Sequence, residues 1–170
     1  MTSAPAVHTC SVHVRASFGG DEALRFAAML VRMYQRWAAR EGLPCELDAL
    51  AGDLDGDSER GREGEVQRAT LELRGEGLRE RLGGEAGVHR LVRIPPGETR
   101  RYTSFVSVAV TAGDEDVDAA LAEVGAVQVR SYVLNPAPSV TDNRNGARTE
   151  DAQAVLDGDL TIFVPATPRP

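Results

Sequence analysis

Arginine is the residue type in this sequence whose spacing most clearly suggests a chemical task. All 19 basic residues are arginines, and several of them fall within one short stretch: Arg79, Arg81, Arg90, Arg93, Arg100 and Arg101. The planar guanidinium group binds phosphate through paired N–H donors. Tyr102 follows directly, and a tyrosine ring can stack on a nucleobase. The stretch is consistent with RNA contact, or with solvated faces in a chain that uses arginine in place of lysine throughout.

No other catalytic or metal-binding constellation emerges from the sequence. The three histidines and two cysteines lack the spacing of metal ligands. The run DLDGD (53–57) is similar to a calcium loop, but its glycine and terminal glutamate are out of register. Nucleophile-elbow, phosphate-loop and dinucleotide-binding motifs are absent, and Ser104 and Ser131 have no recognisable base partner. We therefore expect no metal, no cofactor and no catalytic residue.

Length and composition are typical of a small cytoplasmic domain. The chain has 170 residues and a net charge of −7, which argues against a general nucleic-acid binder. No apolar run is long enough to cross a bilayer, and the first residues lack the pattern of a secretion signal. We therefore expect Cys10 and Cys45 to be reduced and buried.

The hydrophobic pattern predicts both strands and helices. Alternating apolar residues favour strands, and the spacing of Phe26, Leu30, Met33 and Trp37 favours a long amphipathic helix. The predicted strands are His8–Ala16, Leu43–Leu50, Val66–Arg74, Val88–Ile94, Tyr102–Thr111 and Val127–Leu134. The predicted helices are Asp21–Arg40, Leu78–Leu82, Asp114–Val124 and Thr149–Asp157, the last with Thr149 as its N-cap. The charged segment Ala51–Glu65 is predicted to be a loop.

This order of elements predicts an α+β fold in which a mostly antiparallel sheet packs against helices. We expect one compact domain over residues 7–160. It would consist of segments 7–112 and 127–160, joined by the short linker 113–126. Residues 1–6 and 161–170 are expected to be flexible, loose tails.

Two blocks of the sequence resemble a known family. GVHRLVRIPPGETRRYTSF (Gly87–Phe105) and RSYVLNPAPSVTDNRNGARTEDAQAVLDGDL (Arg130–Leu160) are similar to the bacterial class I peptide chain release factors, most closely the type that reads UGA and UAA. The resemblance extends from about Val12 to Leu160 and implies that family's codon-recognition superdomain. In the family, a catalytic domain carrying Gly-Gly-Gln lies between the blocks. Here only Val106–Val129 lies between them, too short for a domain, and Gly-Gly-Gln is absent. The resemblance therefore implies a truncated relative that also lacks the N-terminal helical domain.

The resemblance also implies which residues approach RNA. In the family, a glycine and a glutamate at a helix start lie against the first codon base, and the matching residues here are Gly19 and Glu22. A base-stacking histidine of the family is replaced by Tyr102, followed by Thr103. The codon-discriminating tripeptide is missing from the shortened loop RIPPGETRRY, where Thr99 is the nearest substitute. With the neighbouring arginines, the candidate RNA- and ribosome-binding residues are Gly19, Glu22, Arg90, Arg93, Thr99, Arg100, Arg101, Tyr102 and Thr103.

Three functions follow as hypotheses. The first is a non-catalytic release-factor-like protein that binds the small-subunit decoding region, with rRNA and mRNA, in translation termination, rescue or its regulation. It would carry out neither peptidyl-tRNA hydrolysis nor standard stop-codon discrimination. The second is a docking subunit for a separate hydrolase, and the third is a repurposed protein- or RNA-binding module. The last block, with its polar turn at Gly146, is expected to be architectural.

Overall fold

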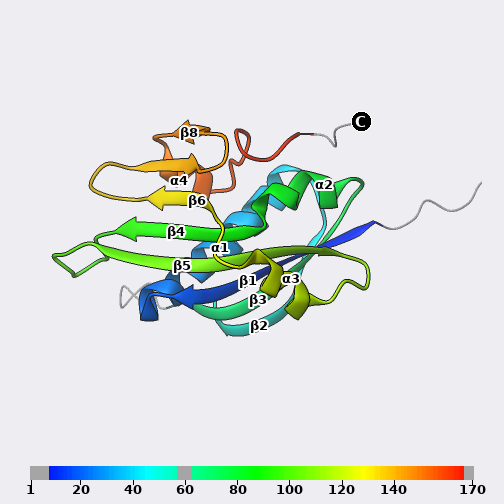
Figure 1. The fold of residues 1–170 in the computed structure, drawn as a ribbon, viewed down its shortest axis with the longest axis horizontal. Coiled ribbons are helices and arrows are strands. Elements are labelled where there is room, and N and C mark those ends of the chain that lie inside the picture. The colour runs from blue at the N-terminus through cyan, green and yellow to red at the C-terminus, as the bar shows by residue number, and fades with distance from the viewer. Residues whose placement is uncertain (1–7, 57–62, 167–170) are drawn as a thin grey trace, which may run out of the picture.

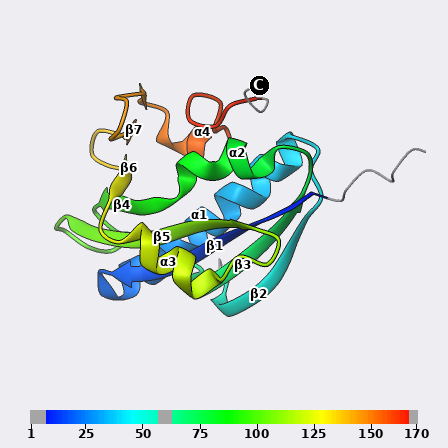
Figure 2. The same ribbon diagram turned by 45° about the vertical axis from the view of Figure 1, so that its right-hand side comes forward.

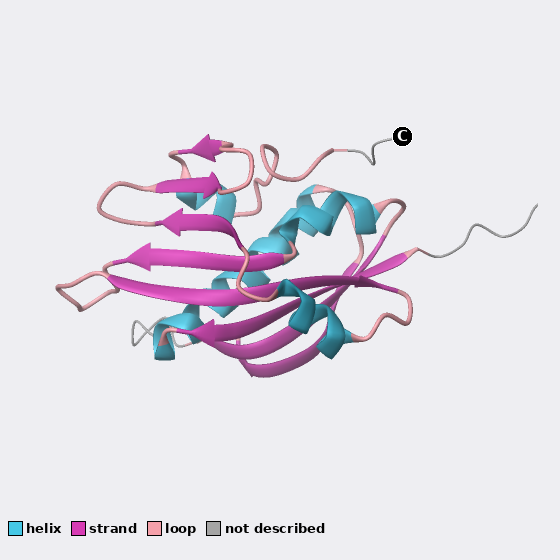
Figure 3. Ribbon diagram, viewed as in Figure 1, coloured by secondary structure: helices cyan, strands magenta, loops and turns pink. Residues whose placement is uncertain are grey.

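The alternating apolar residues assemble into one sheet in the computed structural model, which describes residues 8–56 and 63–166. Within these residues the strands form an eight-stranded sheet in the order β2-β3-β1-β5-β4-β6-β7-β8 (Figures 1 and 3). The strands are β1 Thr9–Phe18, β2 Cys45–Asp53, β3 Glu65–Arg74, β4 Gly87–Arg93, β5 Tyr102–Ala112, β6 Gln128–Val133, β7 Ser139–Asp142 and β8 Arg148–Thr149. In this described sheet only β4 and β6 run parallel, and every other neighbouring pair is antiparallel. The predicted α+β fold with a mostly antiparallel sheet is confirmed.

The ends of several strands differ from the prediction. β1 continues through Phe18, two residues beyond the predicted end, and β2 extends to Asp53 into the predicted loop 51–65. Pairing with β3 supplies the reason, because Asp53 lies opposite Glu65 in register. The remainder of that loop lies largely outside the described residues, as does the predicted tail 1–6.

Helix α1 (Gly20–Arg40) covers one face of the sheet and lies behind it in Figure 1. Its predicted apolar stripe is buried, and Phe26, Leu30 and Met33 pack into the core with inward residues of β1, β3 and β5. Full burial of side chains of this size contributes about 1.5–3 kcal/mol each. The stripe therefore holds α1 on the sheet. Phe26 also meets Tyr132 of β6 edge-on at 5.3 Å, so the last block shares the same core.

Helix α3 (Val117–Val124) covers part of the opposite face, in front of β5 in Figures 1 and 2. Leu121 and Val124 pack against Val88 and Ala109 in a second, smaller cluster. The helix begins three residues later than predicted, because the Asp116 side chain accepts a hydrogen bond from the Ala119 N–H at 2.9 Å and caps it. The predicted linker 113–126 thus contains a helix packed on the sheet.

The last block contains two strands that the sequence did not predict, β7 and β8. Helix α4 (Ala152–Leu156) follows, and its N-cap is Asp151, whose side chain accepts from the Ala154 N–H at 3.0 Å. The predicted N-cap, Thr149, is wrong: it lies in β8, and its hydroxyl accepts instead from the Asp151 N–H at 3.1 Å. Gly146, in the polar turn, has a φ of 77°, which glycine adopts readily.

The C-terminal segment packs on the domain beyond the predicted boundary at residue 160. Val164 is buried, and the Phe163 ring lies 4.2 Å from the guanidinium carbon of Arg130. The Arg81 side chain donates to the Pro165 carbonyl at 2.8 Å. The expected loose tail 161–170 is therefore wrong for its first half, because apolar and cation–π contacts hold it to the core.

The remaining elements complete the α1 side of the sheet. They are helix α2 (Leu78–Leu82), as predicted, and the 3₁₀ helix η2 (Gly83–Glu85). Cys10 is buried with a free thiol, whereas the free thiol of Cys45 is only half-buried because β2 is an edge strand. The predicted burial is therefore confirmed for Cys10 and wrong for Cys45.

Candidate functional site

The turn between β4 and β5 and the start of α1 lie at the same end of the sheet (Figure 1). β4 ends at Arg93 and β5 begins at Tyr102, which is its register partner. Gly19 precedes α1 and approaches β5 so closely that a Cβ at this position would lie 2.6 Å from the Ser104 Cβ. Its φ of 124° is also one that residues with a side chain rarely adopt. Only glycine allows the helix to begin this close to the strand.

Four of the predicted RNA-binding residues are exposed on or beside this turn: Thr99, Arg100, Arg101 and Thr103. In the described parts of the chain, no carboxylate lies within ion-pair distance of Arg100 or Arg101. The Arg100 guanidinium carbon lies 5.1 Å from the centre of the half-buried Tyr102 ring, and its Nε donates to the Tyr102 hydroxyl at 3.4 Å. The turn therefore presents positive charge beside an aromatic ring.

The base of the turn is held by Asn135, which belongs to the last block. Its side-chain oxygen accepts from the Ile94 N–H at 2.6 Å, and its side-chain amide donates to the Ile94 carbonyl at 3.2 Å. The Glu98 N–H donates to the Pro95 carbonyl at 3.0 Å and closes the turn. The two blocks of the sequence thus build this end of the molecule together.

Two predicted site residues, Glu22 and Arg93, are buried and bind each other. Each is 5% exposed, and the Arg93 guanidinium donates to both Glu22 oxygens at 2.7 and 2.9 Å and to Glu63 at 2.8 and 3.1 Å. Burial alone would raise the pKa of Glu22, but the hydrogen bonds and charge of Arg93 lower it overall. The same carboxylates raise the pKa of Arg93 against the effect of burial. These side chains position the start of α1 against β4. Because both are buried, neither offers an exposed donor or acceptor to RNA, and their RNA contact stays a prediction.

Arg90 lies on the opposite face of the sheet from Arg93. Side chains alternate along a strand, so residues three apart point to different faces. Arg90 is half-buried and lies opposite Phe105 in register, on the face that carries α3. It is therefore separated from Arg93, although both were predicted for one surface.

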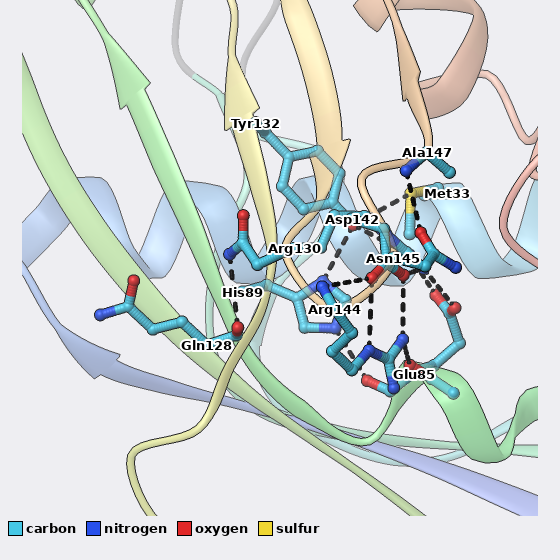
Figure 4. A network of polar contacts seen from close by, with 12 residues as sticks. Met33, Glu85, His89, Gln128, Arg130, Tyr132, Asp142, Arg144, Asn145 and Ala147 are labelled. Atoms are coloured by element: carbon cyan, nitrogen blue, oxygen red, sulfur yellow. Dashed lines mark hydrogen bonds and ion pairs between the residues drawn. The ribbon is translucent and has the colours of Figure 1, made fainter.

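A buried charged network, which the sequence did not reveal, joins the two blocks (Figure 4). Arg130 of β6 is fully buried and donates to both oxygens of Glu85 at 2.5 and 2.7 Å. The Tyr34 hydroxyl of α1 also donates to Glu85 at 2.9 Å. Burial raises the pKa of Glu85, but Arg130 lowers it overall, so this carboxyl stays ionised.

His89 extends this network toward β6. Its Nδ1 lies 2.9 Å from the Tyr132 hydroxyl and its Nε2 lies 2.8 Å from the Glu85 carbonyl oxygen. Burial and the nearby Arg130 lower the pKa of His89 to about 4, so the ring is neutral near pH 7. Since none of these side chains is accessible, the network cannot meet a substrate and is architectural. Arg144 continues it at the surface, donating to Asp142 at 3.0 Å and to the Gly84 carbonyl at 2.6 Å.

The described residues contain no group of three or more His, Cys, Asp or Glu side chains arranged to hold a metal ion. Among the helices of the described segments, none is both long and apolar enough to cross a membrane.

Comparison with known proteins identifies the family. Residues 4–108 match the model of the PCRF domain. The chain belongs to the class I peptide chain release factor family. Both types of release factor are among its relatives: release factor 1 of Chloroherpeton thalassium is 45% identical over 109 residues, and release factor 2 of Thermotoga petrophila is 28% identical over 240 residues. The first match covers 63% of this chain and 28% of the relative, and the second covers 92% and 63%. The chain thus spans less than a third of the release factor 1 relative.

The fold is that of a release factor as well. RF2 of Thermus thermophilus superimposes with a TM-score of 0.72 at 23% identity, over 96% of this chain and 68% of that chain. This match extends to the last block, which lies beyond the PCRF-domain match. It confirms the predicted release-factor-like architecture for nearly the whole length of this chain.

Proposed function

We propose that this protein is a non-catalytic member of the release factor family that binds the decoding region of the small ribosomal subunit. The observation that carries the proposal is the turn between β4 and β5. It presents Arg100 and Arg101 without carboxylate partners in the described chain, beside Tyr102 and next to the start of α1. A cationic turn next to an aromatic ring suits contact with phosphate and with a base of rRNA or mRNA. The protein would act in the cytoplasm in translation termination, rescue or its regulation.

Binding without peptidyl-tRNA hydrolysis is part of the proposal. The sequence has no Gly-Gly-Gln. The match to release factor 2 of Thermotoga petrophila extends over 240 residues, more than the 170 of this chain, so the relative has residues inside the matched stretch that have no counterpart here. In the described structure, the stretch between the two blocks consists of the rest of β5, helix α3 and the start of β6, which supports a chain that docks without hydrolysis.

Standard stop-codon discrimination is not part of the proposal. The turn carries Thr99 and two prolines in place of the tripeptide that distinguishes codons in the family, and Tyr102 stands at the base-stacking position. Stacking on a ring tolerates any base, whereas selection of one base requires donors and acceptors at fixed places. We expect RNA contact with little preference for a particular codon.

Co-sedimentation with ribosomes over a series of salt concentrations tests the proposal. We expect salt-sensitive binding that is weakened in the double variant Arg100→Ala/Arg101→Ala, with the dependence of log Kd on log salt falling by about 1 for each arginine. The matched control is Arg36→Ala/Arg40→Ala, which removes the same charge from the far end of α1. Equal loss in both double variants, or no binding of wild type at low salt, would refute the proposal.

A peptide-release assay on ribosomes that hold peptidyl-tRNA at a stop codon tests the proposal that this protein does not catalyse hydrolysis. We expect no release by this protein alone, and competition with an added release factor for the same site. Codon-dependent release by the purified protein would overturn its non-catalytic assignment. Release that appears only with a separate hydrolase chain would instead support the docking-subunit hypothesis.

A further inference from the structure

The face of the sheet opposite α1 carries an aromatic pair, the exposed Phe18 and the half-buried Phe105, that the proposed interface does not use. The Phe18 side chain, at the end of β1, is 74% exposed. It lies opposite Phe105 of β5 in register, and the two ring centres are 6.4 Å apart with an angle of 51° between the ring planes. Because the rings are tilted and Phe18 is so exposed, at least one of its faces is open to solvent.

The strand register fixes which other side chains share this face. Val106 and Val108 of β5 point into the core beneath α1, so the alternate residues Thr103, Phe105 and Ser107 point the other way. Arg90 of β4 is paired with Phe105, and Arg15 of β1 is paired with Ser107. Two arginines therefore lie beside the aromatic pair on the same surface.

In the described part of the chain, no carboxylate lies within ion-pair distance of Arg15 or Arg90. Carboxylates of the same face lie farther along the sheet: Glu46 and Glu72 are register partners where Glu72 lies opposite Ser11, and the charge of Asp48 acts on His13. Ser11 is seven residues from Phe18 along β1, roughly 23 Å at the usual rise of a strand. In a chain with a net charge of −7, this local excess of positive charge is distinctive.

Helix α3 covers only part of this face. It packs on Val88 and Ala109, with the half-buried Phe105 at the edge of that cluster, and Figure 1 shows the strands uncovered between α3 and the turn that joins β4 and β5. Phe18 is bonded directly to Gly19, which abuts Ser104 of β5. Thr103 is also exposed on this face. The open surface is therefore continuous with the proposed interface at the turn.

We propose that Phe18 and Phe105, with Arg15 and Arg90, form a platform on which single-stranded RNA binds by base stacking and phosphate contact. An exposed phenylalanine on a face that also carries two arginines without ion pairs in the described residues fits this ligand, because the ring takes the face of a base while the guanidinium groups take the backbone. Its placement on the ribosome rests on the proposed function, but its affinity for RNA does not. On the ribosome, the platform would hold a nucleotide next to the one that meets the turn.

The platform is tested with purified protein and a labelled 12-nucleotide single-stranded RNA of mixed sequence, without ribosomes. Fluorescence anisotropy gives the affinity, and a 2-aminopurine base in the same strand reports stacking. We expect Phe18→Ala to weaken binding by at least about fivefold and to remove the 2-aminopurine signal. Phe18→Trp should bind at least as tightly as wild type. Phe18 is exposed, so these changes should leave the fold intact, which the thermal unfolding midpoint would verify.

The matched control is Ile162→Ala, which removes a 48% exposed apolar side chain from the C-terminal segment and should leave RNA binding unchanged. A duplex of the same sequence should bind more weakly, since its bases cannot stack on a ring. The inference is overturned by equal affinity in wild type and Phe18→Ala, by tighter binding of the duplex, or by a Phe18-dependent dimer that binds no RNA. If ribosomes are bound but the single strand is not, this inference fails while the proposed function stands. If the single strand is bound but ribosomes are not, the proposed function fails and this inference stands.

Discussion

Replacement of Arg130 by methionine is the sharpest test of how the last block is joined to the rest of the domain. Arg130 is fully buried, and its two hydrogen bonds to Glu85 link β6 to η2 across 45 residues of sequence. Methionine preserves much of the side-chain volume but removes the charge and the donors. Glu85 is 1% exposed, so the variant leaves an ionised carboxyl buried with the Tyr34 hydroxyl as its remaining side-chain donor.

Removal of one partner from a buried ion pair costs about 3–5 kcal/mol, because the remaining charge is no longer compensated. For a domain of this size, 1 kcal/mol shifts the unfolding temperature by about 2–4 °C, so we expect a fall of about 10 °C. The double variant Glu85→Gln/Arg130→Met removes both charges and should be more stable than Arg130→Met alone. This reversal distinguishes an uncompensated charge from a simple loss of packing.

Urea unfolding followed by the fluorescence of Trp37 provides the assay, because Trp37 is the single tryptophan of the chain and is buried in the core beneath the Arg81 guanidinium. The control is Arg79→Met, which breaks the exposed pair with Glu115 and should leave the urea midpoint nearly unchanged. An Arg130→Met midpoint equal to that of the control would refute the reasoning. A double variant less stable than either single variant would refute it as well.

Two further predictions concern acid and the start of α1. The pKa of His89 is about 4 in the folded protein, against about 6.5 in the unfolded chain. The neutral ring therefore contributes its full stability above pH 6.5, and this contribution is lost as the pH falls toward 4. Between pH 7 and pH 4.5, the free energy of unfolding from urea titrations should fall by about 2–3 kcal/mol in wild type and by less in His89→Gln. His13, whose pKa burial also lowers, adds to the loss in the same direction, and a flat profile would contradict the burial of a neutral ring. Gly19→Ala should lower the free energy of unfolding by about 1–3 kcal/mol. Gly20→Ala should lower it by less, because only at Gly19 would the new methyl group meet β5. Equal urea midpoints for the two variants would contradict the close approach of Gly19 to β5.

The sequence predicted the elements with strong periodicity and missed those without it. The long helix α1 and strands such as β3 and β5 carry runs of apolar residues at a fixed period, and their bounds were predicted to within a few residues. β7 and β8 are short, four and two residues, and lie beside prolines and polar turns. Their existence depends on β6 as a template, which is a tertiary effect that no local pattern records.

The candidate site shows the same division. Arg100 and Arg101 follow a turn signal, and their exposure could be predicted from it. The separation of Arg90 from Arg93 also follows from the sequence, because side chains three residues apart on a strand point to opposite faces of the sheet. The pairing of Arg93 with Glu22 joins residues 71 positions apart and depends on how α1 lies across β4. No spacing rule contains that information.

The exposed turn depends on the last block for its support. Asn135 holds Ile94 at the base of the turn through two hydrogen bonds, and Tyr132 packs against Phe26 in the core of α1. β6 also covers β4, which would otherwise be an open edge with unpaired backbone groups next to the turn. A protein that used only the turn would therefore still need β6, the segment after it and the buried pair of Arg130 and Glu85. The last block therefore supports the turn structurally, whether or not that block touches RNA.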